Sequence, residues 1–201
     1  MNLLPPESPK RALASLLRFM LAGFLLFGAV LFAPIAAFAQ KVGTVNEYQL
    51  KAVFIYNFSK FIEWPDSAFS DSTANFQICV VGNNPFGSAL QTLSNRSYHT
   101  HPIVIKYPQT LNEAKSCHIL YIDDAVKLAP WHDLARNIGD APVLTVSSLS
   151  DATQSGIAIG FVSQDGKIRW AFNLNATRKA QLKVSAKLME IAVTVIGDTS
   201  R

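Results

Sequence analysis

The sequence predicts an α/β fold with a mostly parallel central sheet flanked by helices and a late antiparallel hairpin. From residue 76 to residue 147, short apolar runs alternate with segments of helical spacing, which is typical of a parallel sheet covered on both faces. Later, two runs of period-two alternation flank Asp165-Gly166, a dipeptide that favours a tight hairpin turn. The 201 residues, 49% of them hydrophobic, are enough for one domain with its own core.

The first 39 residues have the layout of a secretory signal peptide. Basic residues lead into an apolar run that continues to Phe38, and the small residues Ala37 and Ala39 form a cleavage site, so we expect a cut after Ala39. An uncleaved anchor is the alternative, since the run from Phe19 to Phe38 has the length to span a bilayer. Both outcomes place a single domain, residues 40–201, outside the cytoplasm. The predicted location is the periplasm.

Charge excludes one class of partner. The formal net charge is +4 for the whole chain, and it falls to +2 when the leader's three basic residues and one acidic residue are removed. A nucleic-acid-binding domain presents a dense basic face, which a balance so close to neutral does not supply. We therefore expect no nucleic-acid partner.

The stretch from Glu47 to Pro65 predicts an amphipathic helix. Its apolar residues recur at the spacing of one helical face, which Ile55 and Ile62 widen: Leu50, Val53, Phe54, Phe58 and Phe61. Asn46 is the expected cap, Glu47 and Lys51 stand one turn apart in the favourable order, and Pro65 ends the helix. So many large apolar side chains require a sheet or a partner to cover them.

Four strands and three helical connections are expected between this helix and the hairpin. The strands are Phe76–Val81, His99–Lys106, Cys117–Ile122 and Pro142–Ser147. The helical segments are Ser88–Leu93, Leu111–Ser116 and Ala125–Ile138, the last capped by Asp124.

The hairpin is expected to pair Ile157–Phe161 with Ile168–Phe172, and a closing helix is expected over Asn175–Ile196. The inward face of that helix would carry Leu182, Ala186, Met189 and Val193. Arg178, Lys179, Lys183 and Lys187 would lie along the same helix as its solvated basic face.

No motif specifies a catalytic site. The turn from Gly82 to Gly87 has the glycine interval of a phosphate loop, but it lacks the Lys and the Ser or Thr that must follow. His99 and His101 would share a strand face, yet no Cys or acidic residue stands at ligand spacing, so we expect no metal. The chain is predicted to be neither an enzyme nor a cofactor carrier.

The ends of two predicted strands form a candidate ligand pocket. In open α/β sheets, ligands bind beyond the carboxyl ends of the strands, where this chain has Gly82, Asn84 and Phe86 after one strand and Asp123 after another. A small-ligand sensor that acts on another membrane partner, such as a sensor kinase, is therefore the alternative function. The competing explanation is structural: a tight turn at Gly82–Gly87.

Cys79 and Cys117 each fall within a predicted strand. An extracytoplasmic location permits a disulfide, and two buried thiols are the alternative.

Several stretches together resemble the YfiR/HmsC-like family of periplasmic regulators, in that family's order and over nearly all of the chain after the leader. They are Glu47–Pro65, Ile78–Gly87, Cys117–Ile122, Pro142–Val146 and Ile168–Asn173. The resemblance implies a bond between Cys79 and Cys117 and a homodimer. A further cysteine pair found in some members is missing, so redox control through that pair does not transfer.

The resemblance also implies a function. A protein of this kind would bind the periplasmic sensor region of an inner-membrane GGDEF diguanylate cyclase and repress it, which lowers cyclic di-GMP and biofilm growth. Candidate contact residues in this chain are Trp64, Arg169, Lys183 and Lys187.

Overall fold

The computed structural model describes residues 36–123 and 134–197, with side chains from residue 47 onward except Ala135. The chain divides into two compact units, residues 1–43 and residues 44–201, and the second unit carries the sheet. The predicted leader lies almost wholly outside the described residues, as do Asp124 and most of the helix expected from Ala125, so these remain predictions. In the described part of the chain, no helix combines the length and hydropathy that a membrane span requires.

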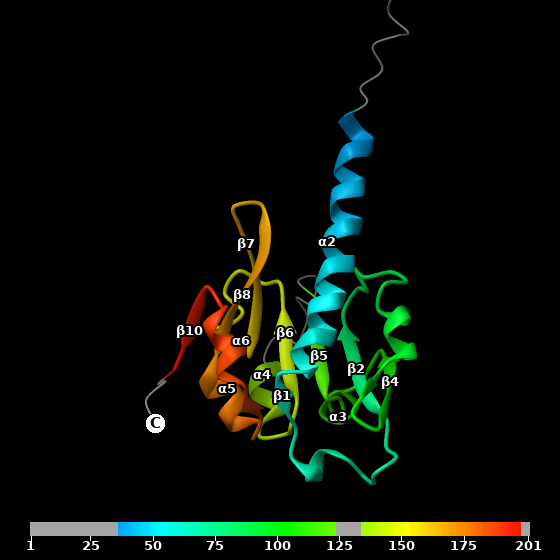
Figure 1. Ribbon diagram of the computed structural model, residues 1–201, viewed down its shortest axis with the longest axis vertical. Helices are drawn as coiled ribbons and strands as arrows, with labels where there is room; N and C mark the ends of the chain where they lie inside the picture. Colours follow the sequence, from blue (N-terminus) through cyan, green and yellow to red (C-terminus); the bar gives the residue numbers. More distant parts are fainter. Residues whose placement is uncertain (1–35, 124–133, 198–201) are drawn as a thin grey trace, which may run out of the picture. The chain divides into compact units, whose positions relative to one another are not determined.

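An eight-stranded sheet forms the centre of the second unit, in the order β10-β8-β7-β6-β5-β2-β4-β3 (Figure 1). Its strands are β2 Phe76–Val81, β3 Ser97–Tyr98, β4 His101–Lys106, β5 Ile119–Ile122, β6 Leu144–Ser147, β7 Ile159–Gln164, β8 Lys167–Asn173 and β10 Thr194–Ile196. A separate two-stranded ladder pairs β1 Ile62–Glu63 with β9 Lys183–Val184.

The strand directions confirm the predicted fold class. The successive neighbours β4, β2, β5, β6 and β7 are parallel to one another, and β7 and β8 form the antiparallel hairpin. Asp165 and Gly166 both have positive φ, 51° and 68°, as the two-residue turn of such a hairpin requires. The short β3 pairs antiparallel with β4 at the other edge.

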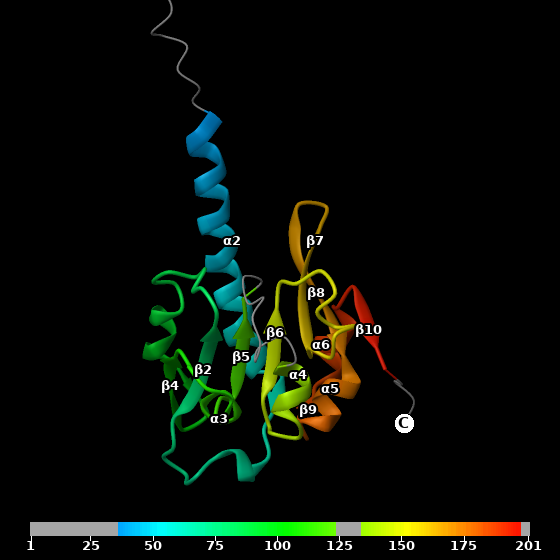
Figure 2. The same ribbon diagram turned by 180° about the vertical axis from the view of Figure 1, so that it is seen from behind.

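Helices cover both faces of the sheet, which gives two hydrophobic clusters. One cluster joins the sheet to α2 (Ala36–Ser59), α5 (Leu174–Lys179) and α6 (Ala186–Glu190). The other joins it to α3 (Leu111–Lys115) and α4 (Leu134–Ile138), which lie in front of the sheet in Figure 2. Two 3-10 segments, Asp66–Ala68 and Gln91–Asn95, complete the described elements. The second replaces the helix expected over Ser88–Leu93.

Helix α2 corrects the sequence prediction at both ends and at two residues of its predicted buried face. The helix already runs through residue 46, so Asn46 is not its cap, and it stops at Ser59 rather than Pro65. The buried face carries Lys51, Ala52, Ile55, Phe58 and Ser59, whereas Leu50 and Val53 are 42% and 48% exposed. Of the predicted face, Ile55, Phe58 and Ile62 are buried, and Phe54 and Phe61 pack against the same core. The helical period therefore selects the face correctly except for Leu50 and Val53 at its margin.

The predicted closing helix over Asn175–Ile196 is wrong. The chain forms α5, β9, α6 and β10 in succession, with breaks where Gln181 adopts φ 57° and where Ser185 is extended. Ile191 to Ile196 is rich in β-branched residues, and β10 joins the sheet edge parallel to β8. Of the predicted inward residues, only Leu182 is buried, and Val193 is 41% exposed.

Candidate functional site

The sheet reverses its strand order at β2, and the predicted ligand residues lie at this point. The chain goes from β2 outward to β4 and then returns to β5 on the other side, which makes the carboxyl ends of β2 and β5 the topological switch point. Gly82 follows β2 and Asp123 follows β5, and the Asp123 amide donates to the Val81 carbonyl at 3.0 Å. The structure therefore brings these two predicted residues together.

Phe86 packs in the core beneath the switch point. It is buried, and its ring contacts Tyr121 at a centroid distance of 4.7 Å and Tyr48 of α2 at 5.5 Å. Asn84 shapes the turn: its Oδ1 accepts from the Phe86 amide and its Nδ2 donates to the Tyr107 hydroxyl at 3.2 Å. Phe86 is a core residue, and the ligand role of Gly82, Asn84, Phe86 and Asp123 stays a prediction.

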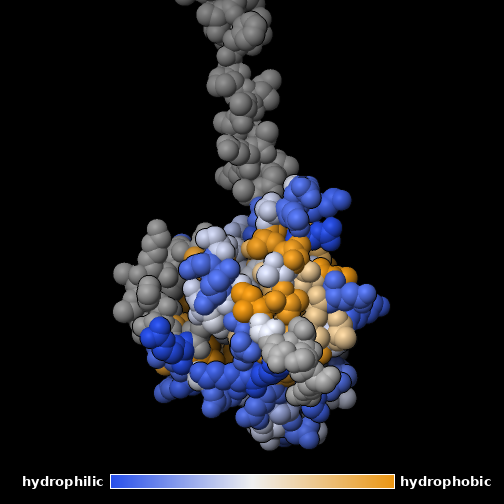
Figure 3. Space-filling model, turned by 90° about the vertical axis from the view of Figure 1, so that its left-hand side faces the viewer, coloured by the Kyte–Doolittle hydropathy of each residue, from blue (hydrophilic) through white to orange (hydrophobic). Residues whose placement is uncertain are grey.

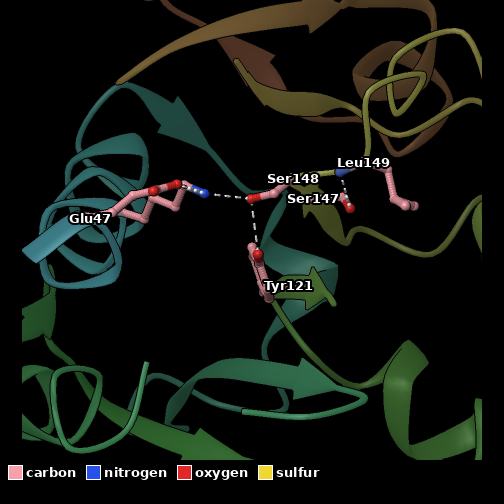
Figure 4. Close-up of polar contacts among 6 residues, drawn as sticks. Glu47, Tyr121, Ser147, Ser148 and Leu149 are labelled. Atoms are coloured by element: carbon pink, nitrogen blue, oxygen red, sulfur yellow. Dashed lines mark hydrogen bonds and ion pairs between the residues drawn. The ribbon is translucent and has the colours of Figure 1, made fainter. Parts of the chain in front are cut away.

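A buried lysine of α2 contacts Ser148, which directly follows β6. Figure 4 shows Ser148 with its neighbours Tyr121 and Glu47. Lys51 of α2 pairs with Glu47 at 2.6 Å, and its Nζ donates to the Ser148 hydroxyl at 2.9 Å. Ser148 in turn contacts the Tyr121 hydroxyl at 3.0 Å. The sequence predicted the Glu47–Lys51 pair but not its burial.

Two aromatic rings complete the surroundings of Lys51. Its Nζ lies 4.6 Å from the ring centroid of Tyr48 and 5.7 Å from that of Phe161. A buried ammonium group is tolerated only when it is paired and hydrogen-bonded, and ring faces add further attraction. This cluster holds α2 against the carboxyl ends of β5 and β6.

Trp64 is buried, which corrects its predicted role as a surface contact. It is 7% exposed, and its Nε1 donates to the His118 carbonyl at 3.2 Å. Its ring meets Phe76 and Tyr98 edge-on at 5.0 and 5.4 Å. Trp64 therefore belongs to the core. No signal in the sequence distinguishes a buried Trp at this position from an exposed one that contacts a partner.

His118 forms the centre of the same aromatic cluster. Its Nδ1 accepts from the Gln77 amide at 3.0 Å, so Nε2 carries the proton and donates to the Ala68 carbonyl at 3.1 Å. The ring stacks between Phe69 and Phe76. Burial lowers the pKa of His118 from 6.5 to about 4, so the imidazole is neutral at ordinary pH.

Arg169, Lys183 and Lys187 are all exposed, as expected of contact residues, but they lie on separate elements. Arg169 is on β8, Lys183 on β9 and Lys187 on α6. Lys183 borders an open groove of ≈ 700 Å³ between the β1–β9 ladder and β3. The predicted single basic helix face does not exist, because the helix is broken at Gln181.

The side of the molecule where β10 lies presents an apolar surface. Figure 3 shows hydrophobic side chains gathered there and surrounded by hydrophilic ones. Ile191 and Val193, which precede this edge strand, are 51% and 41% exposed. Apolar surface of this kind marks an interaction face when it is contiguous and rimmed by polar groups.

Cys79 and Cys117 form a disulfide, as the family resemblance implied. It joins β2 to the residue pair that leads into β5 and closes a separation of 38 residues. Both cysteines are buried.

Histidines provide no metal centre in the described part of the chain. His101 Nδ1 contacts the Ala74 carbonyl at 2.6 Å, while His99 sits in a turn with φ 49°. Across residues 36–123 and 134–197, no three His, Cys, Asp or Glu side chains converge on a position that could hold an ion. The predicted absence of cofactors is not tested by this observation.

Comparison with known proteins identifies a family. The model of the YfiR/HmsC-like family matches residues 48–193. No curated protein matches the chain. Among solved structures, a conserved domain protein from Vibrio cholerae O1 biovar eltor is similar at 12% identity with a TM-score of 0.42, covering 60% of this chain and 54% of that one.

Proposed function

Because the chain belongs to the YfiR/HmsC-like family, we propose that it binds the sensor region of an inner-membrane diguanylate cyclase and represses that enzyme. Members of this family are periplasmic regulators of cyclic di-GMP signalling rather than catalysts. The single observation that carries the proposal is the match over residues 48–193, which includes every strand of the described sheet except the edge strand β10 (Thr194–Ile196).

Repression requires the regulator to bind the inactive state of the cyclase more tightly than the active state. A tenfold shift toward the inactive state needs a differential affinity of about 1.4 kcal/mol, which a few good contacts supply. The proposed contacts are Arg169, Lys183 and Lys187, whose exposed cations would meet an acidic partner surface. Trp64 is left out because it is buried.

Deleting the gene tests the function. We expect cellular cyclic di-GMP to rise, and the rise to vanish when the neighbouring membrane cyclase is also deleted. Complementation with the wild-type protein should restore the low level. Unchanged cyclic di-GMP in the single deletion would contradict the proposal.

Charge reversal tests the contact surface separately. The variant K183E/K187E should restore repression poorly and bind the purified periplasmic region of the cyclase at least tenfold more weakly. K167E is the control, because Lys167 is also exposed but starts β8 beside the hairpin turn. If both variants repress normally, Lys183 and Lys187 do not contact the cyclase, but the proposed function is not contradicted.

The homodimer is part of the proposal. Sedimentation of the purified protein should give twice the mass of the monomer over micromolar concentrations, and a monomer throughout would refute that part.

A further inference from the structure

A second cavity, of ≈ 570 Å³, opens on the face of the sheet that α3 covers. Gln77 of β2 and Val104 of β4 are direct neighbours in register and form its floor, and Cys79 and Lys106 are the next such pair. These residues alternate with the core positions Ile78 and Ile105, so they point to the opposite face. The cavity lies near the amino end of β2, away from Gly82 at the switch point.

Its walls combine cations with neutral hydrogen-bonding groups. Lys106 and Lys115 are the charged lining residues, and neither forms an ion pair within the described part of the chain. The polar neutral lining residues are Ser67, Ser70, Asn75, Gln77, Ser116 and the neutral imidazole of His118. Among the lining residues that the structure describes, there is no carboxylate. The volume is in the range of small-molecule sites.

Nearby acidic groups are already engaged. Asp71, which flanks the lining residue Ser70, accepts from the Ser70 hydroxyl at 3.1 Å and from the Thr73 amide and hydroxyl. Glu113 accepts from the Thr110 hydroxyl and the Gln109 amide at the other end of α3. Both carboxylates keep their negative charge, but among the described residues neither forms an ion pair with Lys106 or Lys115.

We propose that this cavity binds a small molecule through a phosphate or carboxylate group. Lys106 and Lys115 would supply the positive charge, and the side-chain amides of Asn75 and Gln77 would donate hydrogen bonds to the oxyanion. Charge-assisted hydrogen bonds are the strong ones, and neutral donors fix the orientation of the ligand. This site goes beyond the proposed repression of a cyclase, since no partner protein takes part.

The disulfide holds the two halves of the cavity together. Cys117 lines it and is adjacent in sequence to Ser116, which caps α3, while Cys79 stands beside Lys106 on the neighbouring strand. The bond thus fixes the α3 wall, which carries Lys115, against the β2–β4 floor. Reduction should weaken anion binding.

Calorimetry with the protein expressed from its full sequence tests the site. The probes are inorganic phosphate and succinate, each titrated at constant ionic strength against sodium chloride. We expect saturable one-site binding of at least one probe, and which probe binds identifies the anion class. In K106Q/K115Q the affinity should fall at least tenfold.

The control is K167Q, which removes one exposed lysine charge at the hairpin and should bind as the wild type does. Both lysines of the site are exposed, so the double variant should keep its circular dichroism spectrum. Binding that does not saturate, or equal affinity in K106Q/K115Q and the wild type, overturns the proposal. Neither result bears on cyclase repression, which is measured in cells with the partner present.

Discussion

At the residue scale, Lys51 departs furthest from its expected place. Lysine side chains ordinarily face solvent, yet the ammonium group of Lys51 is buried and contacts Glu47 and Ser148. A buried ion pair adds little stability compared with apolar side chains of the same size. Removing only one partner, however, lowers stability because it leaves a buried charge uncompensated.

Substitutions of Glu47 and of Lys51 should therefore change the free energy of unfolding by different amounts. E47Q removes the counter-charge of a buried cation and should lower the free energy of unfolding by about 1 kcal/mol, a modest loss because Glu47 is partly exposed. K51M removes the cation itself, keeps a long side chain and should cost less. Urea unfolding measures both, and a larger loss in K51M would contradict the explanation.

His118 should make stability depend on pH. The pKa of His118 is 6.5 in ordinary surroundings and about 4 in the folded protein. Between pH 6.5 and pH 4, His118 is therefore protonated in the unfolded chain but neutral in the folded protein. Stability is therefore full above about pH 6.5 and falls as the pH drops toward 4, by about 3 kcal/mol at most.

Urea unfolding at pH 7.5 and pH 4.5 measures this slope. In H118N, the part of the pH dependence of stability that comes from His118 should disappear. The variant should also be less stable than the wild type at both pH values, because the two hydrogen bonds between the ring and the backbone are lost. The control H99N, at an exposed turn, should keep the slope. An unchanged slope in H118N would mean that other groups cause it.

At the element scale, α2 shows how far a periodic pattern reaches. The sequence predicted a helix and placed Ile55 and Phe58 on its buried face, which the structure confirms, but it also placed Val53 there, and Val53 is exposed while Ala52 is buried. The sheet sets the centre of this face, because Phe161 and Trp170 contact both Phe54 and Phe58.

Adjacent substitutions on α2 test that orientation. A52K places a charge at a position that is 2% exposed and should lower the free energy of unfolding by more than about 3 kcal/mol. V53K makes the same charge change at a position that is 48% exposed and should alter it by less than about 0.5 kcal/mol. Thermal or urea unfolding ranks the two, and the reverse order would refute the assigned face.

At the scale of the whole molecule, the disulfide secures the middle of the sheet. On the chain-entropy model, closing a separation of 38 residues stabilises the fold by about 4 kcal/mol. C79A/C117A should therefore unfold at a clearly lower guanidinium concentration. A reductant should shift the wild type toward the same midpoint and leave the variant unchanged, and a wild type that ignores reduction would contradict a structural role.

Much of the architecture was predictable because it follows from local patterns. β2 was predicted with its observed bounds, and Asp165-Gly166 indicated the hairpin by itself. The closing region failed because helical spacing of Leu182, Met189 and Val193 outweighed the β-branched residues near β10. For the candidate site, strand order brought Gly82 and Asp123 together as expected, but a sequence pattern does not reveal that Phe86 and Trp64 are buried.

The sequence by itself determined the fold class, the alternation of strands and helices along the chain and the turn of the hairpin, because period, turn residues and apolar runs act over a few neighbouring positions. Only the tertiary structure decided the order of the strands in the sheet, the burial of Lys51 and which lysines line a common cavity. These depend on residues far apart in the chain, such as Lys51 and Ser148, that meet only when the sheet has assembled.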